Sequence, residues 1–321
     1  MASFRPCVIR GEDAALMAPT KTTPVRSEVA GVRLTHPDRV LYPEQGLTKL
    51  DLAEFYERIS DWILPHIIER PLSMLRCPEG RGKACFFQKH AGTGVPEHLK
   101  PVEIMESQTR REYLFVEDER GLVSLAQMGV LEIHPWGSRV GHLEEPDRMI
   151  LDLDPGPGVS WPRVIEGARR LRSMLDKLKL VSFVKTTGGK GLHVVVPLAP
   201  RPTWTVLKEF SRAIATELVN RYPREYTATL SKAERVGKIF VDFLRNSRGA
   251  TAVAAYSTRA WAGAPVSTPV AWSELGPGLR SDRYNVENLE KRLATVKKDP
   301  WEGFFKIRQS IPKSPFKKIS Q

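Results

Sequence analysis

Residues 148–158, RMILDLDPGPG, have the pattern of a buried β-strand that ends at a proline–glycine turn. Working outward from this stretch, apolar periods of helix and strand alternate along the second half of the chain. We predict a helix over 161–179, strands over 181–186 and 192–197, a helix over 203–221 and a strand over 238–243. This order predicts an α/β (α+β) fold in which a β-turn-β element lies between two helices.

Two carboxylates lie on the strand that opens this pattern. Asp152 and Asp154 are residues i and i+2, so their side chains point to the same face of a sheet. Two such acids repel each other unless a cation lies between them. The pattern is compatible with a divalent metal held by oxygen ligands, and equally with two solvated acids at a strand end.

A third acid, Asp242, lies among the large apolar residues of IFVDF (239–243). A buried carboxylate needs a partner, which is either a shared metal or a salt bridge to nearby Arg245. Three acids carried on strands suit two hard cations about 3.5–4 Å apart, the arrangement used for in-line phosphoryl displacement.

The glycine-rich stretch TTGGKGLH (186–193) separates two predicted strands. Three glycines in four positions let the backbone approach a ligand closely, and Thr187 and Lys190 add groups that bind phosphate. It is not a Walker A loop, because a strand rather than a helix follows it. His193 begins that strand and is a candidate donor to phosphate. The alternative is a tight hairpin with an exposed lysine.

The first half of the chain predicts shorter elements. They are a strand over 32–34, a helix capped by Thr48 and running to about Ile67, strands over 72–76, 84–89 and 113–117, a helix near 122–129 and a strand over 130–134. His134 ends the last of these strands. A single histidine on a strand is either a satisfied structural residue or a ligand.

A basic stretch with aromatics runs from 70 to 89. It contains Arg70, Arg76, Arg81, Lys83 and Lys89 with one acid, Glu79. Cations there would contact a phosphate backbone, and Phe86 and Phe87 would stack on bases. Adjacent strand residues face opposite ways, so at most one of the two should face a one-sided core. Arg39 and Lys49 flank another turn and are candidates for a separate anion site.

Composition agrees with a polyanionic partner. The 321 residues carry 49 Lys and Arg against 37 Asp and Glu, a formal charge of +12, with 41% hydrophobic residues. These values exclude a wholly disordered chain, and no apolar run is long enough to span a bilayer. Without a signal peptide, we expect a cytoplasmic protein. The chain has three cysteines. A metal site built from Cys77, Cys85 and His90 would lack a fourth ligand, so we expect the cysteines to be buried or incidental free thiols.

Seven stretches in order resemble the polymerase domain of bacterial ligase D, in the archaeo-eukaryotic primase superfamily. They are LTHPDRVLYPEQGLTK, RPLSMLRCPEG, CFFQKH, LEIHPWGS, RMILDLDPGPG, FVKTTGGKGLHVVVPL and VDFLRNSRGATAVAAYSTR, spanning roughly 34–259. The resemblance implies a primase-like catalytic core with an RRM-like antiparallel or mixed sheet flanked by helices. Proline-rich ends without apolar periodicity predict a flexible leader over 1–27 and a tail over 311–321, so the primase-polymerase domain would occupy 28–310. The domain would comprise a DNA-binding part (28–120) and a catalytic core (121–310).

The resemblance further implies a nucleotidyltransferase that extends 3′-OH ends at DNA double-strand breaks and gaps, in non-homologous end joining. It assigns Asp152, Asp154 and Asp242 to two Mn²⁺ or Mg²⁺ ions. It places around the incoming nucleotide, preferably a ribonucleotide, His134, Thr187, Lys190, His193 and Arg259, to which we add Arg245. It assigns Arg39 and Lys49 to a downstream 5′-phosphate, and Arg76, Phe86 and Phe87 to DNA. Ku and the ligase and nuclease modules are the implied protein partners.

Two departures from the family pattern are visible. Thr187 replaces a common serine and keeps its hydroxyl, and Leu75 stands where some members carry a basic residue, although Arg76 remains.

Other functional classes stay open. A stand-alone primase would use the same chemistry, a non-catalytic nucleic-acid-binding module would explain the charge but not three strand acids, and a metal-dependent nuclease fits the glycine-rich turn less well.

Overall fold

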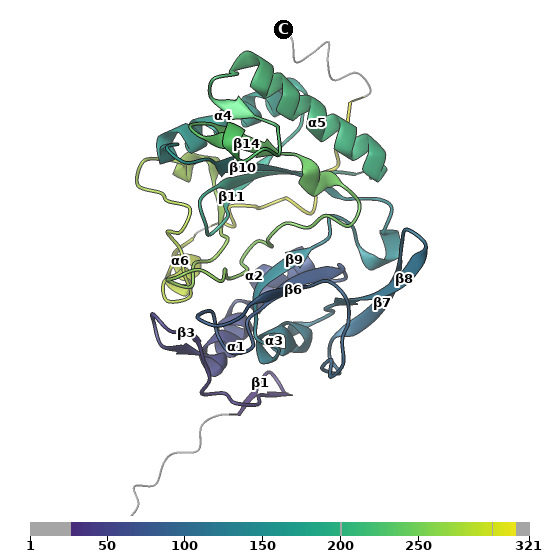
Figure 1. Cartoon of the computed structure of the whole chain (residues 1–321), viewed down its shortest axis with the longest axis vertical. Helices are drawn as coiled ribbons and strands as arrows, with labels where there is room; N and C mark the ends of the chain where they lie inside the picture. The colour runs from purple at the N-terminus through teal and green to yellow at the C-terminus, as the bar shows by residue number, and fades with distance from the viewer. Residues whose placement is uncertain (1–26, 200, 297, 313–321) are drawn as a thin grey trace, which may run out of the picture.

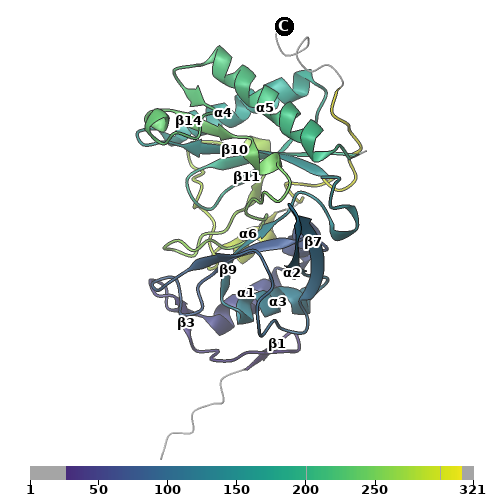
Figure 2. The ribbon, with the colours of Figure 1, turned by 45° about the vertical axis from the view of Figure 1, so that its right-hand side comes forward.

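The structure, a computed structural model, describes residues 27–312 except 200 and 297. Two β-sheets occupy opposite ends of its long axis (Figure 1). Elements before residue 136 form the lower end, and the strands and helices from 148 to 242 form the upper end. The chain then returns, so that α6 (Leu289–Thr295) lies against the lower end (Figure 2). The arrangement creates a boundary between two sheets where a site can form.

The upper sheet has six strands in the order β13-β14-β10-β12-β11-β15. Neighbours are antiparallel except β13 and β14. The strands are β10 (Arg148–Pro155), β11 (Phe183–Thr186), β12 (Leu192–Pro197), β13 (Tyr226–Thr227), β14 (Ile239–Asp242) and β15 (Pro269–Val270). The predicted strands of this half are therefore confirmed, each within two residues at either end.

Two helices, α4 (Trp161–Lys177) and α5 (Trp204–Arg221), cover one face of this sheet (Figure 1). Strand β10 turns Met149, Leu151 and Leu153 toward them, and all three are fully buried. Because side chains alternate along a strand, Asp152 and Asp154 point to the opposite face, toward the lower end of the molecule. Burial of one face thereby aims the carboxylates at the boundary between the sheets.

The lower sheet follows the order β6-β5-β8-β7, and β9 also pairs with β5. Its strands are β5 (Leu72–Arg76), β6 (Phe86–Gln88), β7 (Lys100–Glu106), β8 (Thr109–Phe115) and β9 (Val130–Pro135). Two small hairpins precede it, β1 (Glu28–Val29) with β2 (Val32–Arg33) and β3 (Val40–Tyr42) with β4 (Leu47–Thr48). The strand expected at 113–117 begins earlier, because it forms a hairpin with β7, which was not predicted.

Three helices, α1 (Lys49–Arg58), α2 (Ser60–Ile67) and α3 (Glu119–Gln127), pack on this sheet. The single helix predicted from Thr48 to Ile67 is interrupted at Ile59, whose φ of −107° and ψ of 13° leave the helical range. The predicted cap is confirmed, since Thr48 and Asp51 form a capping box. Helix α3 begins three residues before the predicted start, because the Asp118 side chain accepts the Gly121 N–H.

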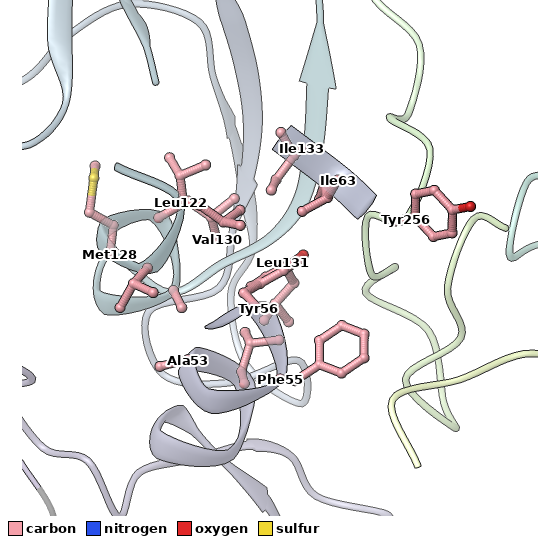
Figure 3. Close-up of a cluster of buried hydrophobic side chains, with 14 of the residues drawn as sticks. Ala53, Phe55, Tyr56, Ile63, Leu122, Met128, Val130, Leu131, Ile133 and Tyr256 are labelled. Atoms are coloured by element: carbon pink, nitrogen blue, oxygen red, sulfur yellow. The ribbon is translucent and has the colours of Figure 1, made fainter. Parts of the chain in front are cut away.

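The lower core receives a segment from the far end of the chain. Figure 3 shows Tyr256 at one side of a cluster of buried side chains from α1, α2, α3 and β9. The Tyr256 ring lies 5.8 Å from that of Trp62 in an edge contact, and Tyr56 Oη lies 2.9 Å from Thr258 Oγ1. Packing therefore fixes residues 256–259 against the lower end. The sheets also group α3 and β9 with the lower end, whereas the predicted division at 120/121 assigns them to the catalytic core.

The two described cysteines correct the expectation of thiols, because Cys77 and Cys85 form a disulfide. Strands β5 and β6 pair Arg76 with Phe86, so the flanking residues 77 and 85 lie next in register, with Cα atoms 4.3 Å apart. The disulfide takes both sulfurs from the metal site considered above, and His90 Nε2 lies 3.3 Å from a Glu106 oxygen. Cys7, the predicted leader except residue 27 and most of the predicted tail lie outside the described residues. No helix in the described part of the chain has the length and apolar character needed to cross a bilayer.

Candidate active site

The sheet register brings the three predicted acids together. Asp152 on β10 pairs directly with Asp242 on β14, and on its other side with His193 on β12. Asp154 lies two residues further along the same face of β10. Asp152 and Asp242 are mostly buried, whereas the Asp154 side chain is 51% exposed. The three acids thus lie on one face of the sheet near the C-terminal end of β10, and we call them the carboxylate row: Asp152 and Asp242 side by side on neighbouring strands, and Asp154 next along β10.

Burial and mutual repulsion disfavour the charged form of two of these acids. Burial raises the pKa of Asp242 above its ordinary value, and the neighbouring Asp152 raises it further, despite Arg245. Burial and Asp152 raise the pKa of Asp154 in the same way. Burial also opposes ionisation of Asp152, but His193 and Arg245 lower its pKa to about 2. The row therefore holds charge that a further cation would stabilise.

Two guanidinium groups lie against this row. Arg245 Nε is 3.1 Å from Asp242 Oδ2 and 3.6 Å from Asp152 Oδ2, as the salt-bridge alternative predicted. Arg235 Nη1 is 3.5 Å from Asp154 Oδ2. As the described residues are placed, no three His, Cys, Asp or Glu side chains gather closely enough to hold one ion. The donor set nevertheless fits hard cations. It consists of carboxylate oxygens, and two of these acids keep raised pKa values although guanidinium groups lie beside them.

Eight of the predicted site residues line one cavity of about 360 Å³: His134, Asp152, Asp154, Thr187, Lys190, His193, Arg245 and Arg259. Trp261 forms part of its wall, and the Lys190 amine lies 5.9 Å from the centre of that ring. His193 is buried, and burial together with Lys185 lowers its pKa to about 4, so its imidazole is neutral at pH 7. The cavity therefore brings cations, hydroxyl and imidazole groups to the carboxylate row.

The glycine-rich turn between β11 and β12 has the predicted hairpin geometry. A Cβ at Gly191 would lie 2.2 Å from the Leu153 carbonyl oxygen, so only glycine lets the turn approach β10 this closely. The Thr187 hydroxyl accepts N–H groups of Gly189 and Gly191 at 3.3 and 3.1 Å. The Thr187 hydroxyl therefore helps to fix the shape of the turn. Lys190, the cationic residue of the turn, is exposed and lines the cavity.

Sequence reasoning missed one buried acid at this cavity, Glu132 on β9. Its Oε2 lies 2.9 Å from His134 Nε2, and its Oε1 lies 3.0 Å from Arg259 Nε. Although burial opposes it, His134 and Arg259 lower the pKa of Glu132 to about 2. The signal was available, because Glu132 and His134 are residues i and i+2 of one strand, as Asp152 and Asp154 are.

The two phenylalanines of β6 are both exposed, Phe86 by 48% and Phe87 by 63%. The prediction that at most one faces a core is confirmed, since neither is buried. The Phe87 ring lies 5.6 Å from the His134 ring, which connects it to the cavity. Arg76 lies 5.6 Å from the Phe86 ring centre and donates to Gln88 Oε1 at 2.8 Å. An aromatic surface thus adjoins the cavity.

The basic stretch divides in the structure. Arg70 does not face solvent: its side chain is fully buried, pairs with Asp147 and donates to the Trp136 carbonyl at 3.3 Å. This corrects the expectation that it contacts a phosphate backbone. Arg81 pairs with Glu44, whereas Lys83 and Lys89 are exposed.

The second predicted anion site brings Arg39 and Lys49 together. The backbone N–H of Lys49 donates to the backbone carbonyl of Arg39 at 2.8 Å. The Arg39 guanidinium lies 2.8 Å from Glu79 Oε1. Burial, then the charge of Arg39, lowers the pKa of Lys49 to about 8. Two cations held close together, one of them with a lowered pKa, form a place where an anion would be stabilised.

Comparison with known proteins gives one family. The model of the LigD primase-polymerase domain matches residues 48–301. The multifunctional non-homologous end joining protein LigD of Pseudomonas aeruginosa is 42% identical over 287 residues, 89% of this chain and 34% of that protein. LigD of Mycolicibacterium smegmatis is 35% identical over 257 residues, 79% of this chain and 34% of that protein. The chain spans about a third of the length of these curated relatives.

Among solved structures, the polymerase domain of Mycobacterium tuberculosis ligase D in complex with DNA superposes with a TM-score of 0.80. The two chains are 32% identical, and the match covers 85% of this chain and 97% of the other. The α+β architecture predicted from the sequence is therefore also the architecture of that domain.

Proposed function

The chain belongs to the LigD primase-polymerase domain family, and on this premise we propose that it is a nucleotidyltransferase that extends a 3′-OH at a broken or gapped DNA end. The observation that carries the proposal is the row of Asp152, Asp154 and Asp242 beside a cavity lined with Lys190 and Arg259. Acids alone would repel a polyphosphate, and cations alone would only bind it. Their combination suits transfer of a nucleotidyl group.

The three carboxylates would hold two Mn²⁺ or Mg²⁺ ions. Bound metal lowers the pKa of the attacking 3′-OH and neutralises charge on the triphosphate. The pKa values of Asp154 and Asp242 are raised by burial and by Asp152 even though Arg235 and Arg245 lie beside them, and this supports the assignment because a divalent ion would offset that effect. The Arg245 side chain would have to withdraw from Asp152 and Asp242 to make room.

The cavity residues would bind the incoming nucleotide. Lys190 is exposed on a glycine-rich turn, and Arg259 is paired with Glu132 at 3.0 Å; both line the cavity and would neutralise phosphate oxygens. His193, neutral at pH 7, can donate one hydrogen bond to phosphate or to metal-bound groups. These donors would orient the α-phosphate for in-line attack and stabilise departing pyrophosphate.

The DNA would lie along the lower end of the molecule. Exposed Phe86 and Phe87 offer faces for unpaired template bases, with Arg76 beside them. Arg39 and Lys49 would take the 5′-phosphate downstream of a gap, since burial and the charge of Arg39 both disfavour the charged form of Lys49 and an anion beside it would offset them. This pair favours gap and end repair over priming, because a primase starts without such a phosphate.

Primer extension on a gapped duplex tests the proposal. The substrate carries either a 5′-phosphate or a 5′-hydroxyl downstream of the gap, and each is supplied with NTPs or dNTPs in Mn²⁺ or Mg²⁺. We expect metal-dependent addition, faster with NTPs and stimulated by the phosphate. Stimulation should disappear in Arg39→Ala but persist in the exposed control Arg110→Ala. Addition without phosphate dependence would remove the assignment of Arg39 and Lys49, and no addition in any arm would remove the proposed activity.

A further inference from the structure

A second cavity, of about 530 Å³, lies where β10 begins and β12 ends. The carboxylate row lies near the other end of β10, and no residue lines both this cavity and the one beside the row. A cavity of this size takes a small molecule or one unit of a polymer, rather than a single ion. We call it the arginine cavity, after the four arginines that line it: Arg139, Arg148, Arg201 and Arg308.

The arginine cavity carries more positive charge than its own acids neutralise. Its four arginines face two acids, Glu145 and Asp147. Arg201 Nη1 lies 3.8 Å from a Glu145 oxygen, which is long for an ion pair. Arg308 is exposed, and no acid among the described residues pairs with it. An anionic ligand would therefore be attracted to this cavity and would meet a cation that has no competing partner.

Asp147 is shared by three guanidinium groups at the base of this cavity. Its carboxylate oxygens lie 2.5 Å from Arg70 Nη2, 3.2 Å from Arg148 Nε and 3.7 Å from Arg139 Nε. Burial, then the charge of Arg148, lowers the pKa of Arg70 to about 9, and burial lowers the pKa of Arg148. One carboxylate does not neutralise three guanidinium groups, so a further anion beside them would be stabilised.

One wall of the arginine cavity is aromatic. The Phe305 side chain is 45% exposed, and its ring is packed against the rings of Phe304 and His66, at 5.0 and 5.1 Å between centres. The Arg148 guanidinium lies 5.6 Å from the centre of the buried Phe304 ring. An exposed aromatic face beside guanidinium groups suits a flat base that carries a phosphate. An acidic peptide would satisfy the arginines but would leave the face of Phe305 without a ring to stack on it.

We propose that the arginine cavity is a second nucleotide-binding site, in which the arginines take a phosphate group and Phe305 stacks on the attached base. Free nucleotides and DNA strands share this chemistry, so both are sources of the ligand. A strand bound here would be anchored away from the reaction centre, and would gain affinity without taking part in nucleotidyl transfer. The inference goes beyond the proposed function, because no residue of the carboxylate row is involved.

Methyl NMR of the full chain tests the proposal with one reporter at each cavity. Ile307 lines the arginine cavity, and Val253 lines the active-site cavity. The probes, added without metal, are ATP, a single-stranded oligothymidylate, inorganic tripolyphosphate and a polyglutamate peptide. We expect the Ile307 signal to move with ATP or with the oligonucleotide. Its apparent affinity for tripolyphosphate should be about tenfold weaker, because tripolyphosphate has no base to stack on Phe305.

The pattern of responses separates the two sources. Movement of the Ile307 signal with ATP identifies a free nucleotide, and movement with the oligonucleotide alone identifies a DNA strand; both results support the proposal. An affinity for tripolyphosphate or polyglutamate that equals the affinity for the nucleotide probes would overturn it. So would an Ile307 signal that moves with no probe.

Variants connect the signal to the cavity. Arg308→Gln and Phe305→Leu should each weaken the binding reported by Ile307 about tenfold, the effect of one charge-assisted hydrogen bond or of one stacked base. The response of Val253 should stay unchanged. The matched control is Arg110→Gln, because Arg110 is 73% exposed and lines neither cavity. Undiminished affinity in either folded variant would overturn the proposal, and if Phe305→Leu does not fold, the exposed Arg308→Gln still decides.

Discussion

Replacing Asp242 with asparagine should stabilise the metal-free protein while removing its response to metal. The Asp242 side chain is 10% exposed and directly opposite Asp152 in the sheet. Its raised pKa means that folding disfavours its charge at pH 7, so a neutral side chain removes a penalty. Asparagine keeps the Oδ1 atom that accepts the Leu244 N–H at 2.8 Å.

The size of the effect follows from the pairing. Like charges directly opposite in a sheet destabilise it by up to about 1 kcal/mol. Unfolding entropy of roughly 2.1 cal/mol/K per residue gives a chain of this length about 0.7 kcal/mol/K, so Tm should rise by up to about 1.5 °C. For the wild type, metal at about 100 times its Kd should add roughly 2.7 kcal/mol, or about 4 °C.

The assay is thermal unfolding in EDTA and in MnCl₂, with Asp176→Asn as control because Asp176 is an exposed carboxylate of α4. We expect Asp242→Asn to have the higher Tm in EDTA and little shift with Mn²⁺. The control should match the wild type in both conditions. A lower Tm in EDTA, or a full Mn²⁺ shift in Asp242→Asn, would refute the reasoning that this acid is placed for a cation.

Three further outcomes are expected. Asp147→Asn leaves the fully buried Arg70 guanidinium without its carboxylate, so unfolding in urea should show a loss of about 3–5 kcal/mol; an unchanged midpoint would contradict this. The pKa of Glu132 is about 2 in the folded protein against 4.5 in the unfolded chain, so its contribution to stability is complete above pH 4.5 and is lost as the pH falls toward 2. Between pH 5 and 3 the free energy of unfolding of the wild type should fall by about 2 kcal/mol more than that of Glu132→Gln. Parallel curves of stability against pH would contradict this role of Glu132. Phe87→Ala should weaken binding of an overhanging DNA by about tenfold, measured by fluorescence anisotropy, with Tm unchanged because the ring is exposed; equal affinity would remove Phe87 from the DNA surface.

Most of the upper sheet was predictable, because its strands are continuous apolar runs bounded by glycine and proline. RMILDLD has one fully apolar face, so its burial and the direction of Asp152 and Asp154 follow from strand alternation. The lower end was harder. Strand β7, KPVEIME, is largely exposed, so its residues lack the apolar alternation that predicts a strand.

The remaining misses depend on contacts between distant residues. Nothing local marks Ile59 as the end of α1, and the burial of Arg70 depends on Asp147, far along the chain. The disulfide requires the β5–β6 register, which pairs Arg76 with Phe86. Most of the site residues were candidates from their own spacing, the family resemblance supplied their roles and added Arg259, and the structure gathers eight of the predicted residues on one cavity. Glu132 was missed because an i, i+2 pair on a strand was considered as a site only where both residues are acids, and the residue two positions after Glu132 is His134.

The central claim is that the carboxylate row performs metal-dependent nucleotide addition. The most direct measurement is incorporation of a labelled NTP onto a DNA primer in Mn²⁺, comparing the wild type with Asp152→Ala and with Asp176→Ala. We predict addition by the wild type and by Asp176→Ala, and loss of at least about 10³-fold in Asp152→Ala, a size expected when charge stabilisation in the transition state is removed. Addition by Asp152→Ala at the wild-type rate, or by the wild type in EDTA, would contradict the account.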